Sequence, residues 1–310
     1  MSELIATGRR RAGASTASRR QRYWDVRAAG NFIGGGTGSG LIVAAAVAAA
    51  SGASFRATLV LGVALIAAGL ALVWLEIGKP WRALHVFFHP RTSWMTREGI
   101  VAAAVIPLGV VAAAVSRPTL AVITAALAVG FLYCQARILR AARGIPAWRQ
   151  QEIVALILAA GLAEGCALAL IVGPRGDVAL GLALAAGLAR ELAWRFYRSA
   201  LAREAGAAAS LAVFAAPTAR RLRALHRAGL GLIAAALVTP IFLDPVPIVA
   251  VLAMAGGALV LLSGWGMKAL LITRAAFTRT FVIPATPTRG HRPDILSGGR
   301  RRGFERRRAP

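Results

Sequence analysis

Long uninterrupted apolar runs are the feature that most constrains the fold of this chain. A membrane-spanning helix needs about 20 consecutive apolar residues to cross a hydrocarbon core of roughly 30 Å, and the chain has several such runs. With 57% hydrophobic residues and a mean hydropathy of +0.64, a soluble fold would have too little polar surface to cover itself. A transmembrane β-barrel would show short alternating segments instead. The sequence therefore predicts an all-α, polytopic integral membrane protein.

The apolar runs predict eight transmembrane helices, which we expect to pack as two four-helix halves. Pro107 and Pro240 fall inside predicted spans, where neighbouring helices can satisfy the backbone groups that proline frees. The glycine-rich run at 34–40 lacks the Lys-Ser/Thr of a phosphate loop, so it indicates close helix packing. The predicted membrane domain covers residues 28–283. A basic tail at 1–27 precedes it, and a basic tail at 284–310, predicted to be disordered, follows it. The predicted spans are residues 30–51, 57–77, 99–116, 118–136, 153–174, 176–193, 228–243 and 246–267.

The net charge of +25 has a strongly uneven distribution along the chain. Of the 37 Lys and Arg residues, 34 lie in the amino-terminal tail, in alternate connections (the last of them from Arg190 to Arg227) and in the carboxyl-terminal stretch from Lys268 on, whereas Arg56, Arg117 and Arg175 lie in the other connections. Cytoplasmic connections of membrane proteins carry such an excess of cations. We therefore expect both termini and the connection between the second and third spans to be cytoplasmic, in an inner membrane. This distribution argues against nucleic acid as a partner and for membrane lipids, on which the basic tail can lie.

The connection from residue 76 to residue 98 is dense in polar and aromatic side chains. Glu76 and Glu98 stand at its two ends, where ionisable groups near a membrane are candidates for function. One hypothesis is that these carboxylates carry protons between water and a buried ligand. The alternative, which stays open, is that they pair with Arg82 or Arg97 and tie the connection down.

The histidines and cysteines limit the cofactors that this chain can hold. His85 and His89 are four residues apart with no third metal ligand apparent, so a hydrogen bond to a ligand or interfacial packing is favoured over a metal site. His226 and His291 also lie outside the middle of any predicted span, which argues against a transmembrane haem. The two cysteines form no CxxC pair, so the chain is not expected to ligate an iron–sulfur cluster or zinc ion.

A few polar residues interrupt the later spans. Glu164 lies midway along the fifth span, where a hydrogen bond to a neighbouring helix is favoured over a role in a proton path. Arg190 and Glu191 close the sixth span and are adjacent, so we expect them to have different partners. Tyr133 lies near the end of the fourth span, two residues before Gln135.

Three blocks of sequence resemble one family. They are Asn31 to Gly38, the stretch Gly78 to Glu98, and Arg137-Ile138 through Gly144-Ile145-Pro146-Ala147-Trp148. In these blocks the chain is similar to the membrane anchor subunits of molybdopterin oxidoreductases, the polysulfide reductase/DMSO reductase anchor family, also called NrfD-like. With eight predicted spans, the resemblance covers nearly the whole chain.

The resemblance implies a function and a set of partners. Family members bind a quinone, either ubiquinone or menaquinone, near the second and third spans and carry no haem. They dock on a ferredoxin-like iron–sulfur subunit with four clusters, which contacts a catalytic subunit holding a molybdenum bis-pterin cofactor. Electrons then pass between the clusters and the quinone pool.

Site residues follow partly from this resemblance. Gly78, Arg82 and Glu98 match the pattern of the DMSO reductase branch, whereas Glu76 departs from it because that branch has His there. The expected quinone-binding and proton-relay residues are Glu76, Gly78, Arg82, His85, Glu98 and Tyr133, and the expected partner-docking residues are Lys79, Trp81, His89, Arg91, Trp94 and Arg97.

The predicted orientation narrows the choice within the family. DMSO and polysulfide reductases carry their catalytic subunits outside the cytoplasm, so a cytoplasmic docking face is more similar to the sulfite-oxidising complexes. We therefore expect sulfite:quinone oxidoreduction, with the anchor of a DMSO, polysulfide or other reductase as the alternative. A secondary transporter is the alternative from a different class, and it would need discontinuous helices near the middle of the membrane.

Overall fold

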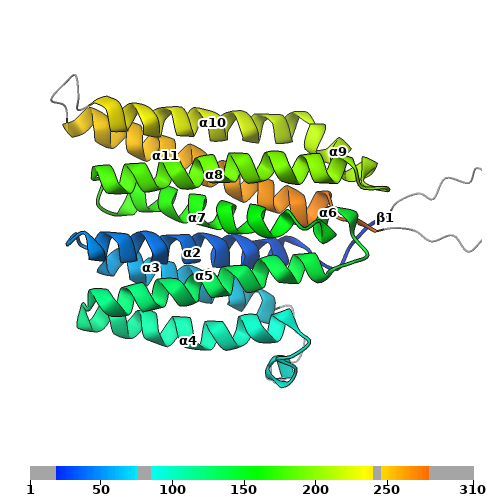
Figure 1. The fold of residues 1–310 in the computed structure, drawn as a ribbon, viewed down its shortest axis with the longest axis horizontal. Coiled ribbons are helices and arrows are strands. Elements are labelled where there is room, and N and C mark those ends of the chain that lie inside the picture. The colour runs from blue at the N-terminus through cyan, green and yellow to red at the C-terminus, as the bar shows by residue number, and fades with distance from the viewer. Residues whose placement is uncertain (1–18, 76–84, 240–245, 279–310) are drawn as a thin grey trace, which may run out of the picture. The chain divides into compact units, whose positions relative to one another are not determined.

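The computed structural model describes residues 19–75, 85–239 and 246–278, which all belong to one unit of the chain, Ala17–Arg279. Long helices dominate this unit (Figure 1). They are α2 (Val26–Ala50), α3 (Arg56–Trp74), α4 (Trp94–Val115), α5 (Pro118–Ala141), α7 (Ile153–Val172), α8 (Asp177–Ala202), α10 (Pro217–Val238) and α11 (Val246–Ala269).

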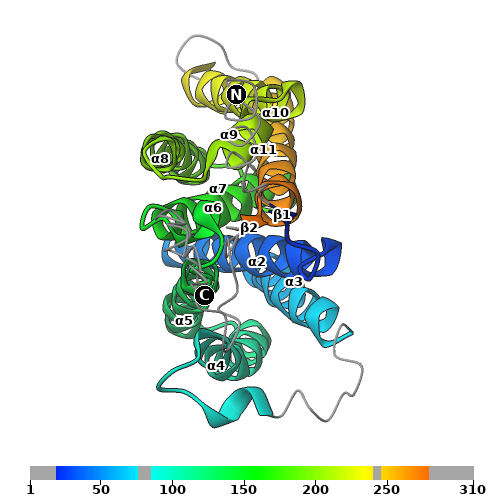
Figure 2. The same cartoon turned by 90° about the vertical axis from the view of Figure 1, so that its right-hand side faces the viewer.

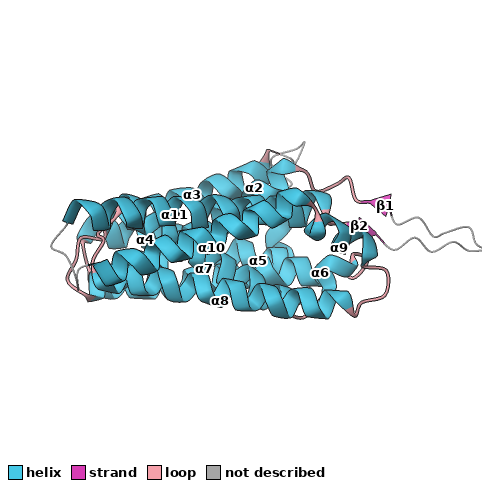
Figure 3. Ribbon diagram, turned by 90° about the horizontal axis from the view of Figure 1, so that it is seen from above, coloured by secondary structure: helices cyan, strands magenta, loops and turns pink. Residues whose placement is uncertain are grey.

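Short elements gather at one end of the helices, as Figure 3 shows for the two strands. Strand β1 (Arg19–Arg20) pairs antiparallel with β2 (Phe277–Thr278), so the two ends of the unit are hydrogen-bonded together. The remaining short elements are α6 (Pro146–Arg149), α9 (Ala208–Ala215) and a single π-helical segment, η3 (Leu270–Arg274).

Capping and proline chemistry sets where several helices begin. The Asp25 side chain accepts a hydrogen bond from the Arg27 N–H at the start of α2, and Ser93 accepts one from the Thr96 N–H at the start of α4. Pro118 and Pro217 occupy the first turns of α5 and α10, where a proline has no hydrogen bond to lose.

The long helices pack as two groups of four. In the first group α2, α3, α4 and α5 contact one another in a closed ring, and α7, α8, α10 and α11 do the same in the second. Helices α2 and α7 pack against each other and join the groups at the centre, as the view in Figure 2 shows. Each group has its own apolar core, and a further core of aromatic and aliphatic side chains lies near α6.

The glycine-rich part of α2 is a packing surface. A Cβ placed on Gly38 would overlap the backbone carbonyl of Gly62 in α3, and one placed on Gly40 would overlap that of Gly161 in α7. Glycine therefore allows α2 to approach both neighbours at backbone distance. The packing role predicted for this run is confirmed.

The chain is an all-α polytopic membrane protein. Within the described ranges, six helices are long and apolar enough to cross a membrane: α2, α3, α4, α5, α7, and α11 with its π-helical continuation. Helices α8 and α10 also coincide with predicted spans but do not meet that standard, and charged residues interrupt both, among them Arg190 and Glu191 in α8 and Arg223 and Arg227 in α10. Helix α8 ends later than its predicted span, and α10 begins earlier than its own. In both cases an amphipathic, Arg-rich segment that resembles a loop in the sequence continues the helix.

Cations divide sharply between the two ends of the helices. We call the end that carries α6, α9 and the two strands the basic end (Figure 1). Among the described residues, Arg56, Arg117 and Arg175 are the cations near the opposite end, at the starts of α3 and α5 and in the connection before α8. Two cations assigned from the sequence to the basic connections, Arg190 and Lys268, are instead buried within α8 and α11.

Candidate functional site

An apolar cavity of about 730 Å³ opens between α2, α3 and α4 towards the basic end. Val86 and Phe87, from a short 3₁₀ turn at 85–88, line it together with Met95 at the start of α4. Two indoles, Trp24 and Trp74, also line it. The volume and the mainly apolar lining are those of a small-molecule pocket, for which about 300–1,000 Å³ is usual.

Glu98 is the carboxylate of this cavity. It lies one turn into α4 and is 5% exposed. The side chains of Gln135 from α5 and Asn31 from α2 interact with it, and both are buried. The Gln135 amide also donates to the Asn31 backbone carbonyl at 3.2 Å. Helices α2, α4 and α5 thus bring three polar side chains together in apolar surroundings.

Each of these three side chains has an acceptor oxygen with no hydrogen-bond partner among the described residues. These atoms are Oε1 of Glu98, Oδ1 of Asn31 and Oε1 of Gln135. Buried acceptors are normally paired, because an unpaired one costs about 1–3 kcal/mol. Glu98 and Asn31 line the cavity, so their oxygens can accept hydrogen bonds from a bound molecule that carries hydroxyl groups.

A cluster of cations and aromatic rings lies nearby on α4 and α5. The guanidinium carbons of Arg97 and Arg137 lie 4.1 and 4.2 Å from the ring centroid of Trp94. Tyr133 meets the same indole edge-on at 5.7 Å, and Arg137 donates a hydrogen bond to its hydroxyl. We call Trp94, Arg97, Tyr133 and Arg137 the Trp94 cluster.

Arg97 also shapes the connection before α4. Its guanidinium donates to the carbonyls of Pro90 and Arg91, each at 2.8 Å. The hypothesis that Arg97 ties the connection down by pairing with a glutamate is therefore wrong for Glu98, which has no ion pair with any described cation. Arg97 holds the connection through backbone carbonyls instead.

The predicted site residues fall into three groups. Glu98 lines the cavity, whereas Tyr133 belongs to the Trp94 cluster and His85 is exposed, its ring 5.5 Å from that of Phe88. Of the predicted docking residues, Trp94 and Arg97 come together, while His89 and Arg91 are exposed in the connection. Glu76, Gly78, Lys79, Trp81 and Arg82 lie outside the described residues.

Asn31 and Gln135 are site residues that were not predicted as such. Both are amides inside otherwise apolar runs, which is a signal that a sequence carries. Gln135 fits against α2 because position 35 is glycine, and a Cβ there would overlap the Gln135 amide. That fit depends on the packing of α2 against α5 and is not visible in the sequence.

A second buried polar cluster lies where α2, α7 and α11 meet. The Lys268 ammonium is 2.8 Å from Oε2 of Glu164, and both side chains are almost fully buried. Thr37, on α2, donates a hydrogen bond to the same carboxylate oxygen at 2.9 Å. The predicted hydrogen bond between Glu164 and a neighbouring helix is therefore confirmed. Trp265 in turn donates to the Thr37 hydroxyl at 2.9 Å.

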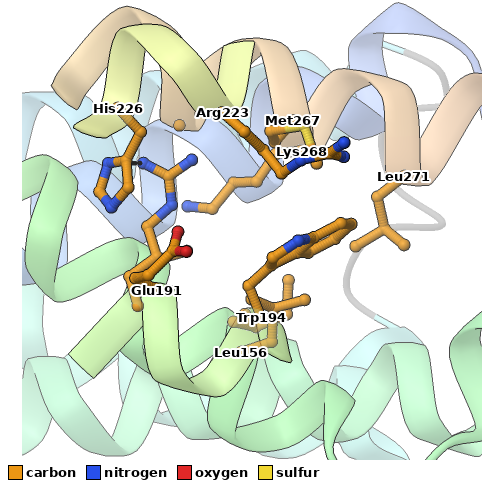
Figure 4. Close-up of a pocket in the computed structure, with 12 residues that line it drawn as sticks. Leu156, Glu191, Trp194, Arg223, His226, Met267, Lys268 and Leu271 are labelled. Atoms are coloured by element: carbon orange, nitrogen blue, oxygen red, sulfur yellow. Dashed lines mark hydrogen bonds between the residues drawn. The ribbon is translucent and has the colours of Figure 1, made fainter. Parts of the chain in front are cut away.

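Arg190 and Glu191 have different partners, as predicted. Arg190 approaches His226 Nδ1 at 3.0 Å and donates to Ser263, whereas Glu191 pairs with Arg195 and Arg227. A small cavity of about 30 Å³ lies between these groups and Lys268. Figure 4 shows Glu191, His226 and Lys268 around this space, with Trp194 and Leu271 beside it.

No family model matches the chain, and no curated protein matches its sequence. Among the described residues, no three His, Cys, Asp or Glu side chains are grouped so that they could hold a metal ion. The two polar sites are therefore interpreted from their geometry alone.

Proposed function

We propose that the chain is the quinone-binding membrane anchor subunit of a molybdopterin/iron–sulfur oxidoreductase. The observation that carries this proposal is the apolar cavity with Glu98 and Asn31 in its wall and Gln135 beside that carboxylate. The residues fit a quinone: the apolar lining suits its ring and tail, and the buried acceptors suit the hydroxyl groups of its reduced form. A quinone takes up two electrons and two protons when it is reduced.

Glu98 has the position that a proton carrier needs. Its carboxylate is buried in the cavity wall, and the cavity leads towards the basic end past Val86 and Phe87. A carboxyl group can take a proton from water and give it to a ligand within hydrogen-bond reach. Asn31 and Gln135 orient this carboxyl group from two different helices.

The basic end is the proposed docking face, and we place it in the cytoplasm together with both termini. Its excess of arginine supports that orientation, since cytoplasmic connections are enriched in cations. The proposal also takes α8 and α10 as membrane spans, which gives eight. The Trp94 cluster and the exposed rings of Phe87 and Phe88 supply the aromatic and Arg side chains that protein interfaces favour.

The proposed partners are a four-cluster ferredoxin-like subunit and a molybdopterin catalytic subunit, with sulfite as the substrate of the latter. A transporter is less well supported, because it would need broken helices in the membrane. Helix α4 continues through Pro107 without interruption over Trp94–Val115, and Pro240 lies outside the described residues.

The test is purification of the complex in gentle detergent, followed by assay with sulfite. We expect a cysteine-rich chain and a molybdopterin chain to co-purify without export signals. In the complex with Glu98→Gln, sulfite should still reduce the clusters but quinone turnover should be lost. Glu152→Gln, at the basic-end start of α7, is the matched control and should retain turnover.

Two outcomes would overturn parts of this proposal. Survival of quinone turnover in Glu98→Gln would exclude the proton-carrying role. Twin-arginine signals on the partner chains would invert the orientation and favour a periplasmic reductase, and purification of the chain alone would favour the transporter.

A further inference from the structure

The ion pair between Glu164 and Lys268 is the most deeply buried charge pair of the described residues, with side chains 0% and 3% exposed. Glu164 lies at the middle of α7. Charges at this depth in a membrane are costly, and a buried pair is weak evidence for stability because desolvation offsets its attraction. A requirement for folding alone therefore does not explain why both groups are charged.

The hydrogen bonds around Glu164 are distributed unevenly between its two oxygens. Oε2 receives the Thr37 hydroxyl at 2.9 Å and the Lys268 ammonium at 2.8 Å. Oε1 is buried and has no hydrogen-bond partner within the part of the chain that the structure describes. Lys268 is held independently, because it also donates to the Phe32 carbonyl at 3.1 Å. Oε1 can therefore bind a proton while Thr37 and Lys268 hold Oε2 in place.

A polar route leads from this pair towards the basic end. The cavity of about 30 Å³ beside Lys268 is large enough for about two waters, at roughly 10–15 Å³ each. Arg190, Glu191 and His226 line it. Glu191 in turn pairs with Arg227, whose side chain is 60% exposed. Titratable and charged groups therefore continue from the surface of α8 and α10 to Lys268.

The opposite side of the pair is closed by helix packing. A separate cavity of about 300 Å³ enters from the other end and is lined by Cys166, Ala169 and Asp177. Between this cavity and Glu164, α2 and α7 are in backbone contact, since a Cβ on Gly165 would overlap the backbone of Gly40 and Leu41. This backbone packing lies between the cavity of about 300 Å³ and Glu164.

We propose that Glu164 and Lys268 form a proton-binding site that exchanges protons with the basic-end side only. Gly264 lines the small cavity and faces Oε1, since a Cβ built there would lie 2.6 Å from that oxygen. A proton from a hydronium ion in the cavity passes beside Gly264 and binds Oε1, which converts the carboxylate to a carboxylic acid and leaves a water molecule. Lys268 keeps its own proton and its bond to Phe32. This site is separate from the Glu98 cavity and does not depend on the proposed quinone chemistry.

Infrared spectroscopy of the full chain in lipid nanodiscs tests whether Glu164 binds a proton. Lowering the pH should produce the carbonyl band of a protonated carboxyl group that is lost in Glu164→Gln and kept in Glu98→Gln. Lys268→Met should show the band across the whole pH range, because the carboxylate has lost its counter-ion. Thr37→Val perturbs the site less than Lys268→Met does, because it removes only the hydrogen bond from the Thr37 hydroxyl to Glu164. It should shift the frequency of the carbonyl band. A spectrum unchanged in Glu164→Gln or Thr37→Val would overturn the proposal.

The route is tested by the rate at which that band exchanges in deuterium oxide. Ala160→Leu adds bulk to the small cavity and should remove the fast exchange phase. Ala169→Leu adds the same bulk to the cavity at the opposite end and is the matched control. If Ala169→Leu slows the exchange and Ala160→Leu does not, access is from the other side and the proposed route is wrong.

Discussion

The ammonium group of Lys268 occupies the space that a side chain at position 36 would fill. A Cβ built on Gly36 would overlap Lys268 Nζ, so α2 admits the cation only because it has glycine there. From this position Lys268 reaches Glu164 on α7 and the Phe32 carbonyl on α2. One buried cation on α11 therefore contacts both helices that join the two halves of the molecule.

We predict that Gly36→Ala destabilises the protein by displacing Lys268. Breaking a buried ion pair costs about 3–5 kcal/mol, because one charge loses its partner. Gly231→Ala on α10 is the control, since a Cβ there has open space and alanine favours helix by about 0.5–1 kcal/mol. Thermal unfolding in detergent should give a lower midpoint for Gly36→Ala and an equal or higher one for Gly231→Ala. Equal midpoints for Gly36→Ala and the wild type would contradict the role given to this glycine.

A double-mutant cycle should show that Glu164 and Lys268 are coupled. Lys268→Met removes the counter-ion of Glu164, so the buried carboxyl group has to take up a proton, and loss of the ion pair should cost about 3–5 kcal/mol. Adding Glu164→Gln replaces the unpaired carboxyl group with a neutral amide, so the double variant should recover most of the loss, whereas independent residues would give additive effects. Unfolding free energies of the four proteins in one detergent measure the coupling. Additive losses would show that the pair is not a unit.

The sequence was informative about the helices and less so about their contacts. Apolar runs alone predicted where α3, α5 and α7 lie, because a membrane requires continuous apolar length. The sequence did not predict that α10 starts at Pro217. The arginines that follow Pro217 are typical of a cytoplasmic loop, and the sequence does not show which face of a helix they would share. The local sequence pattern therefore predicts that these helices exist more accurately than it predicts where they begin and end.

The candidate sites show the same limit. Glu98 was predicted because a carboxylate beside an apolar run is costly and visible in the sequence. Its partners Asn31 and Gln135 are about a hundred positions apart and meet only through helix packing. Lys268 was counted with the carboxyl-terminal cations, because its pairing with Glu164 across 104 positions leaves no local trace.

The cavity beside Glu98 should bind a quinone in a way that tryptophan fluorescence reports. Trp24 and Trp74 line the cavity, so a bound quinone should quench their emission. Ala102→Phe adds a ring to the cavity wall, and overpacking of about 1–3 kcal/mol corresponds to about tenfold weaker binding or more. Ala57→Phe, at the exposed start of α3 near the opposite end, should bind as the wild type does. Equal quenching in Ala102→Phe and Ala57→Phe would place the quinone elsewhere.

Arg97→Lys should loosen the connection before α4 although it keeps the charge. Lysine cannot reproduce two guanidinium bonds to the Pro90 and Arg91 carbonyls while lying flat on Trp94. A loss of one or two kcal/mol of local stability should speed amide hydrogen exchange of Thr92 and Ser93 by a factor of about 5–30. Arg91→Lys is the control, because its side chain is exposed. Unchanged exchange in Arg97→Lys would show that the aromatic contact alone holds the connection.

The start of α2 should be sensitive to acid. The Arg27 backbone N–H and side chain, bonded to Asp25, lower the pKa of that carboxyl from its ordinary value of 3.8. Because the folded pKa is depressed, the stabilisation is complete above the unfolded value and is lost as the pH falls through the folded one. Amides in the first turn of α2 should therefore lose protection in acid, after correction for intrinsic exchange, while those at the start of α4, capped by the Ser93 hydroxyl, should not.

Asp25→Asn keeps a capping acceptor and should remove the acid sensitivity, and Asp25→Ala should leave the turn frayed at every pH. If Asp25→Asn remained as acid-sensitive as the wild type, the carboxylate would not be the group that titrates.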